Sequence, residues 1–260
     1  MTDTLPLLKT NRILITLDSS PRGRAALDAA LQLAMNTSAE LQGLFVEDED
    51  LVRLASLPFS REVDFASASS QKLHSAHMEH ALRTAGEEAQ RAFVKALQQL
   101  NLHWTFRVVR GTVTQTSLAA AADVDLLVIG QQGRSPRIIS GAYLPKRSLN
   151  ATRVVAIFDG TPSAFRAIEL ANDLAKDSPI LVLVLANTGN EVASQCRSWL
   201  EAKNLRAELD QALNPTQDTV IDYVKKWSPS VLVINRDSAF INDSQICRLV
   251  NEFECPLILC

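Results

Sequence analysis

Residues 12–34, RILITLDSSPRGRAALDAALQLA, decide the fold, because their design returns at residues 153–175, RVVAIFDGTPSAFRAIELANDLA. Each copy begins as a continuous apolar run that stops at an aspartate, Asp18 or Asp159, and continues into small and polar residues. An unbroken apolar run of this length is typical of a strand buried on both faces of a parallel sheet. Two copies of one strand-to-turn unit therefore predict two related α/β halves.

A helix is expected directly after each turn. Pro21 and Pro162 suit the first turn of a helix, and Ser20 and Thr161 before them suit the N-cap. Apolar residues then recur at helical spacing in both copies: Ala26, Leu27, Ala30 and Leu33 in the first, Ala167, Ile168, Ala171 and Leu174 in the second. The repeat therefore covers a whole strand–turn–helix opening.

Strands alternate with helices through the rest of the chain, which predicts parallel sheets with right-handed crossovers. DLLVIG at 125–130 pairs with SVLVIN at 230–235, and these copies stand closer together than the first pair, so the first half carries extra residues. We expect one domain over 1–150, with an inserted loop and long helix near 50–100, and a shorter one over 151–260. Each is expected to be Rossmann-like, with its own parallel sheet in strand order 3-2-1-4-5. Too few residues follow the fourth strand of the first domain for a closing strand, so that domain is expected to lack it.

Composition narrows the class of partner. The net charge of −3 gives no general attraction to nucleic acid or to an anionic membrane, and no segment approaches the ~20 apolar residues of a membrane span. The first residues lack the basic start and apolar core of a signal peptide, and the four cysteines show no CxxC spacing. We therefore expect a cytoplasmic protein with reduced thiols that binds neither nucleic acid nor membrane.

Two side-chain clusters have an ordinary and a metal-binding interpretation. The acidic run 47–50, EDED, is interpreted as a helix cap followed by first-turn acids, against a divalent-metal cluster. His74, His77 and His80 are interpreted as surface histidines, against two imidazoles that share a metal on one helix face. Residues 58–70 are expected to form a loop.

Several stretches together resemble the universal stress protein family in its tandem, two-domain form. They are the two strand–aspartate units, FVEDEDL at 45–51 after the second strand, DVDLLVIGQQGRS at 123–135, and ECPLIL at 254–259 as a closing strand. The resemblance implies a fold of the adenine nucleotide alpha hydrolase-like kind and a role in the stress response. It covers most of the chain outside 50–100.

One branch of that family binds ATP, and the resemblance implies where a nucleotide would lie in this chain. The aspartate after the first strand and the backbone after the second strand hold adenine and ribose, and a Gly-x-x-Gly loop holds the phosphates. The residues implied for the nucleotide site are Asp18, Ser19, Ser20, Val46, Gly130, Gln131, Gly133, Arg134 and Ser135. A metal is expected only as nucleotide-bound Mg²⁺. Ligands of such sheets sit beyond the carboxyl ends of the strands, at a switch in strand order.

The sequence also departs from the ATP-binding pattern. The family places a further glycine about nine residues beyond the Gly-x-x-Gly loop, and Tyr143 stands at that position here. In the second half Asn235-Arg236-Asp237 replaces the glycine loop, and Asp237 would repel phosphate. A nucleotide is therefore expected only in the first half. Basic residues beyond the glycine loop are interpreted either as a flap that clamps phosphates or as a solvated linker; they are Arg134, Arg137, Lys146, Arg147 and Arg153.

The leading hypothesis is a non-catalytic stress-response regulator or binding module that takes an adenine nucleotide in its first half. One alternative is an enzyme of the same fold that hydrolyses an adenine nucleotide or transfers from it, although no Walker loop and no paired carboxylates lie next to Gly130–Ser135. Another is a structural partner-binder without nucleotide, whose exposed closing strand, 256–260, pairs with another copy. A homo-oligomer or a pseudo-dimer of the two halves is expected. A single undivided sheet, or Asp18 far from Gly130, would argue against the family.

Overall fold

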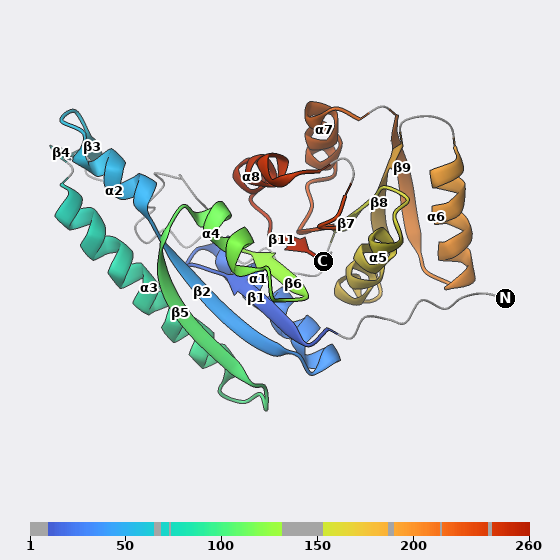
Figure 1. Ribbon diagram of the computed structural model, residues 1–260, viewed down its shortest axis with the longest axis horizontal. Coiled ribbons are helices and arrows are strands. Elements are labelled where there is room, and N and C mark those ends of the chain that lie inside the picture. Colours follow the sequence, from blue (N-terminus) through green and yellow to red (C-terminus); the bar gives the residue numbers. More distant parts are fainter. Residues whose placement is uncertain are drawn as a thin grey trace.

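The structure, a computed structural model, describes residues 10–64, 69–72, 74–131, 153–186, 190–213, 215–238 and 241–260 (Figure 1). The strands in these ranges are β1 (Arg12–Thr16), β2 (Glu40–Asp48), β3 (Arg61–Asp64), β4 (Ser69–Lys72), β5 (Trp104–Gly111), β6 (Leu126–Ile129), β7 (Val154–Phe158), β8 (Ile180–Ala186), β9 (Ala207–Leu213), β10 (Val231–Ile234) and β11 (Leu257–Leu259). The helices are α1 (Pro21–Thr37), α2 (Glu49–Ser56), α3 (Ser75–Leu97), α4 (Val113–Ala120), α5 (Pro162–Ala175), α6 (Glu191–Ala202), α7 (Gln217–Trp227) and α8 (Asp243–Glu252). Of the described helices, none is both long enough and apolar enough to cross a membrane.

Nine of the described strands form one sheet in the order β5-β2-β1-β6-β11-β10-β7-β8-β9. The first half supplies β5-β2-β1-β6 and the second supplies β11-β10-β7-β8-β9, and pairing within each half is parallel. Each half thus has the predicted order of a doubly wound unit, and the α/β class is confirmed. The expectation of one separate sheet for each half is wrong, because β6 and β11 pair antiparallel and join them.

The joint between the halves explains the undivided sheet. In the described part of the first half no strand follows β6, so the outer edge of β6 is available, and β11 fills the place where a closing strand would lie. Leu257 lies opposite Ile129 and Leu259 opposite Leu127, and all three residues of β11 are buried. The closing strand is therefore not an exposed edge, and the idea that it pairs with another copy is wrong.

Helices cover both faces of the sheet. On one face, α1, α3, α5 and α6 pack over alternate strand residues, among them Ile13 and Ile15 of β1. On the other face, α4, α7 and α8 pack over the intervening residues, such as Leu14. Burial on both faces is the reason that the strands of the sheet centre are continuously apolar.

The residues inserted into the first half form an arm beyond the sheet. The C-terminal part of α3 packs on β2, where Gly86 lies against the ring of Phe45. Its N-terminal part packs against α2 through a small separate core of Ala55, Met78 and Leu82. Residues 58–70, expected to be a loop, instead include β3 and part of β4, which pair antiparallel. In Figure 1 β3, β4 and α2 lie at the upper left, away from the second half.

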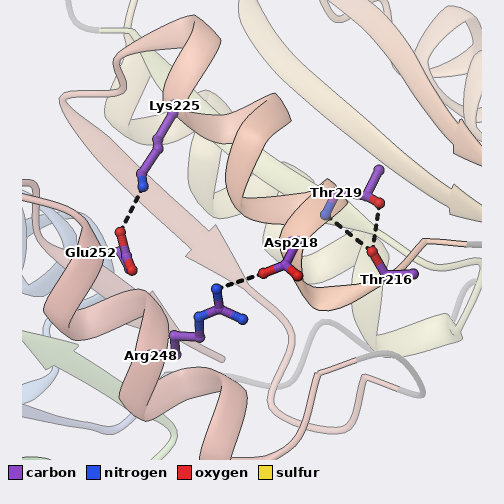
Figure 2. Close-up of polar contacts among 6 residues, drawn as sticks. All are labelled: Thr216, Asp218, Thr219, Lys225, Arg248 and Glu252. Carbon is purple, nitrogen blue, oxygen red and sulfur yellow. Dashed lines mark hydrogen bonds and ion pairs between the residues drawn. The ribbon is translucent and has the colours of Figure 1, made fainter.

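Ion pairs tie α7 to α8 on the second face. Lys225 Nζ lies 2.6 Å from Glu252 Oε2, and Arg248 Nη2 lies 2.5 Å from Asp218 Oδ1 (Figure 2). Thr216 caps α7 by accepting a hydrogen bond from the N–H of Thr219. These contacts fix the C-terminal end of α8, which faces the first half, as described next.

Two arginines cross between the halves near the joint. Arg22, in the first turn of α1, donates from Nη1 to the carbonyls of Val250 and Phe253, at 2.7 and 3.1 Å. Arg236, directly after β10, donates from Nη1 to the carbonyl of Ala121 at 3.0 Å. Each guanidinium therefore binds carbonyl groups at the C-terminal end of a helix from the other half, where the helix dipole favours a cation.

Candidate functional site

The first-half site begins where β1 ends. The carboxylate of Asp18 accepts a hydrogen bond from the N–H of Ser20, 3.0 Å away, and Ser20 Oγ in turn accepts from the N–H of Gly23. Ser20 is thus the N-cap of α1, as predicted. Gly23 allows α1 to start this close to the strand end, because a Cβ there would lie 2.2 Å from the backbone oxygen of Asp18.

The chain leaving β6 crosses directly over the end of β1. The carbonyl oxygen of Thr16 accepts from the N–H of both Gly130 and Gln131, at 2.7 and 3.0 Å. A Cβ on Gly130 would lie 2.3 Å from the methyl of Ala26 and 3.2 Å from the Cα of Gly23. Asp18 and Gly130 therefore both lie against Gly23, and the sequence-based expectation that they meet at one strand edge is confirmed.

Gln131 makes a contact that the sequence did not reveal. Its side chain reaches across the end of β1 to β2, where Oε1 accepts from the N–H of Val46 at 2.9 Å and Nε2 donates to the carbonyl of Val46 at 2.6 Å. Gln131 is 4% exposed and Val46 is fully buried. Both backbone groups of Val46, the residue implied to hold adenine, are thus bound within the chain.

Arg22 is a second polar residue at this edge that sequence reasoning missed. It is 5% exposed, and its Nη2 approaches the carbonyl of Ile129 at 3.5 Å. Burial lowers the pKa of Arg22, and the nearby Cys255 and Asp18 oppose that change. An arginine after the proline of a first helical turn carries no sequence signal of burial, because its acceptors lie between 107 and 231 residues away in the chain.

The other predicted residues are only partly placed. The carbonyl of Ser19 accepts from Arg24 Nη1 at 2.7 Å. Gly133, Arg134 and Ser135 lie outside the described residues, as do Arg137, Lys146 and Arg147 of the basic stretch. Arg153 is described, and its Nη1 donates to the carbonyl of Trp227 at 3.2 Å. Because β7 lies four places from β1 in the sheet order, Arg153 does not belong to the first-half site.

The second half arranges the equivalent positions differently. The carboxylate of Asp159 accepts from both the N–H and the hydroxyl of Thr161, at 3.1 and 2.6 Å. Asn235 stands in the place of Gly130 and donates from Nδ2 to Thr161 Oγ1 at 2.9 Å. Its Oδ1 accepts from the N–H of Asp237 at 3.0 Å. The buried amide of Asn235 therefore fills the space above this strand end.

The two metal-binding alternatives gain no support from the described geometry. Asp48 accepts from the N–H of Asp50 as the N-cap of α2, and Glu49 and Asp50 lie in its first turn, so the interpretation as a cap is confirmed. The rings of His74 and His77 lie 5.9 Å apart, edge to face. Within the described ranges, no group of three or more His, Cys, Asp or Glu residues could hold a metal ion.

The fold and the site together define a doubly wound α/β protein with its candidate site at the carboxyl ends of β1, β2 and β6. The sequence profile of the Universal stress protein family matches residues 9–138, half of the chain, and the chain belongs to that family. The expectation that a single undivided sheet would argue against this family is therefore wrong.

Solved structures of the family resemble the chain over most of its length. A universal stress protein from Archaeoglobus fulgidus DSM 4304 is 12% identical, with a TM-score of 0.55, over 96% of each chain. The universal stress protein UspA from Lactobacillus plantarum is 19% identical, with a TM-score of 0.35, over 67% of this chain and 97% of its own. Only the first likeness is strong enough to bear on the fold, and it bears on the fold alone. A comparison with curated proteins gave no match.

Proposed function

We propose that the chain is a non-catalytic, cytoplasmic binding module that takes an adenine nucleotide at the end of β1 in its first half and transmits its presence to a protein partner. The observation that carries the proposal is the backbone pair of Val46. Its N–H and C=O point into the gap left where β1 ends, and both form hydrogen bonds with a carboxamide there. The N1 and N6 atoms of adenine offer the same acceptor and donor as a carboxamide.

The surroundings of Val46 suit the remaining parts of a nucleotide. The site lies beyond the carboxyl ends of the strands, where the order switches between β1 and β6, which is the usual ligand position in open α/β sheets. Asp18 lies at the same edge and offers a carboxylate to ribose hydroxyls. Gly130 lets α1 lie close to this edge, because a Cβ there would lie 2.3 Å from the methyl of Ala26.

A non-catalytic role fits the contacts that the polar residues already make. Asp18 and Ser20 accept hydrogen bonds from N–H groups at the start of α1, which is the contact pattern of a helix cap rather than of a nucleophile and its base. The enzyme alternative, hydrolysis or transfer from an adenine nucleotide, is separated from binding by measuring turnover.

The test uses the full chain and a matched pair of variants. ATP binding is measured by calorimetry for the wild type, Asp18→Asn and Asp159→Asn, and phosphate release is followed with the same samples. Asn keeps the oxygen that accepts from the N–H of Ser20, so D18N is expected to fold. We expect D18N to weaken ATP binding about tenfold, D159N to leave it unchanged, and no sample to release phosphate steadily. Steady release of phosphate by the wild type would contradict the non-catalytic role and favour the enzyme alternative.

A nucleotide-free, partner-binding module is the second candidate, and one observation favours it. The three side chains Leu54, Leu57 and Phe59, at the end of α2, are 48%, 52% and 91% exposed. Exposed apolar groups of this size are frequent at contact sites. We propose that the two halves of one chain act as a pseudo-dimer. Sedimentation of the full chain measures whether separate copies also associate. Absence of any ATP binding in every variant would favour this candidate.

A further inference from the structure

We infer that the side chain of Gln131 is an internal occupant of the adenine position, which a nucleotide must displace in order to bind. The inference rests on the proposed function and adds a control element to its site. It follows from the geometry at the end of β1, from the chemistry of the carboxamide, and from the burial of the residue.

The geometry places Gln131 where a further residue of β1 would lie. The N–H of Leu17 donates to the carbonyl of Leu44 at 3.1 Å, which continues the pairing of β1 with β2. Beyond that point the chain turns at Asp18, and the next backbone groups of β2 on this side belong to Val46. Gln131 binds both of them, at 2.9 and 2.6 Å, and so completes the hydrogen bonding that the end of β1 leaves open.

The carboxamide of Gln131 offers Val46 the same hydrogen-bonding groups as the adenine base. A carboxamide presents an acceptor and a donor side by side, and adenine presents N1 and N6 in the same order. Guanine presents its acceptor and donor at exchanged positions, with the acceptor O6 outside the ring and the donor N1–H within it. An edge that matches the amide of Gln131 therefore matches adenine, and the site should discriminate against guanine in the same orientation.

Burial makes the two occupants mutually exclusive. Gln131 is 4% exposed, and each backbone group of Val46 is engaged by one atom of its side chain. A nucleotide can reach Val46 only in the fraction of molecules in which Gln131 has rotated away. The apparent affinity is then lower than the intrinsic affinity by that fraction.

Calorimetry with ATP and GTP tests the inference on the wild type, Gln131→Ala and Gln32→Ala. Gln32 is the matched control, because its amide also donates to a backbone carbonyl, that of Asp173, at a contact between α1 and α5. We expect Q131A to bind ATP at least about tenfold more tightly than the wild type, and Q32A to match the wild type. GTP should gain much less from Q131A than ATP does.

The outcomes separate this inference from the proposed function. Equal ATP affinity of the wild type and Q131A would overturn the role of Gln131 and leave the nucleotide site standing. ATP binding by Q131A alone would support the role of Gln131 and show that the wild type stays closed. No binding by either protein would overturn both.

A second measurement needs no variant. One side-chain N–H of Gln131 donates to the buried carbonyl of Val46, and the residue is 4% exposed, so in the free wild-type protein the side-chain NH₂ should exchange slowly with solvent. Saturating ATP should shift their NMR signals and remove the protection. ATP binding that leaves these signals unmoved would contradict displacement, even if Q131A failed to fold.

Discussion

Both halves place an aspartate and an N-cap residue at the end of their first strand, but they close the space above them in different ways. In the first half, glycines at 23 and 130 bring α1 against the strand ends, and Gln131 turns its amide towards Val46. In the second half, Asn235 takes the place of Gly130 and binds the N-cap hydroxyl of Thr161. Among the described residues, a side chain binds both backbone groups of one second-strand residue in the first half alone, and this contrast supports the proposal that the first half holds the ligand.

A second contrast concerns the arginines that cross the joint. Arg22 is 5% exposed and its Nη1 binds two helix-end carbonyls of the second half. Arg236 binds one carbonyl of the first half. Among the described residues, its Nε and Nη2 are buried without a hydrogen-bond partner, whereas in Arg22 this holds for Nε alone. The first-half arginine is therefore expected to contribute more to stability than the second-half arginine, because more of its donors are satisfied.

The largest expected effect follows from replacing these arginines by methionine. Arg22→Met leaves the buried carbonyls of Val250 and Phe253 without their donor and should lower the free energy of unfolding by about 3 kcal/mol. Arg236→Met loses one hydrogen bond but also removes two unpaired buried donors, so its loss should stay below about 1 kcal/mol. Urea unfolding measures both, and equal losses would remove the contrast between the arginines.

The next largest effect is expected at Gly23, where the second half has an alanine. Gly23→Ala would place a Cβ 2.2 Å from the backbone oxygen of Asp18, which cannot move without shifting β1, so we expect a loss of about 2 kcal/mol. The equivalent position in the second half is Ala164, which is buried in α5, and Ala164→Gly should cost only about 1 kcal/mol. Thermal unfolding of the two variants compares the sites. A neutral G23A would mean that the first-half strand end has room for a side chain.

Much of this fold could be predicted from the sequence, because the strands and helices of the repeat are encoded locally. The runs 13–17 and 154–158 are apolar except for Thr16, and the helices after them begin with N-cap residues and keep regular spacing, so the sequence predicts β1, α1, β7 and α5 within a few residues. The antiparallel pairing of Ile129 with Leu257 could not be read in the same way. This pairing depends on which two open strand edges meet in the folded chain. The sequence of a buried apolar strand does not specify which strand pairs with it.

Some residues of the candidate site could also be predicted from the sequence, and others could not. Asp18, Ser20 and Gly130 follow strand ends, and any residue at such a position reaches the same sheet edge, so their meeting was predictable. The partner of Gln131 lies 85 residues away and that of Arg22 lies 228 residues away. Polar residues near a turn are ordinarily exposed, and only the folded chain shows that these two are buried against backbone groups.

The rate of thiol labelling at Cys255 tests whether Arg22 keeps the joint between the halves closed. Burial raises the pKa of the Cys255 thiol to about 11, and Arg22 partly opposes this, so at pH 8 the folded wild type should react slowly. R22M removes that cation, which by itself would reduce the thiolate further. Faster labelling of Cys255 in R22M would therefore report opening of the joint, with Cys196, whose pKa is about 12, as the reference within the second half. Unchanged Cys255 labelling would show that Arg22 does not hold the joint closed.

The smallest effect tests whether the end of α8, which supplies the acceptors of Arg22, depends on its ion pair with α7. Lys225 lowers the pKa of Glu252 by hydrogen bonding and by its charge, so the folded state favours the carboxylate. The stability from this pair is present above the pKa of Glu252 in the unfolded chain and is lost as pH falls through the lowered pKa of the folded state. Glu252→Gln should therefore be slightly less stable than the wild type at pH 7, the difference should shrink as the pH falls towards 3, and added salt should narrow it at pH 7. Urea unfolding at both pH values checks this, and a difference that persists at pH 3 would mean that Glu252 acts through packing rather than through its charge.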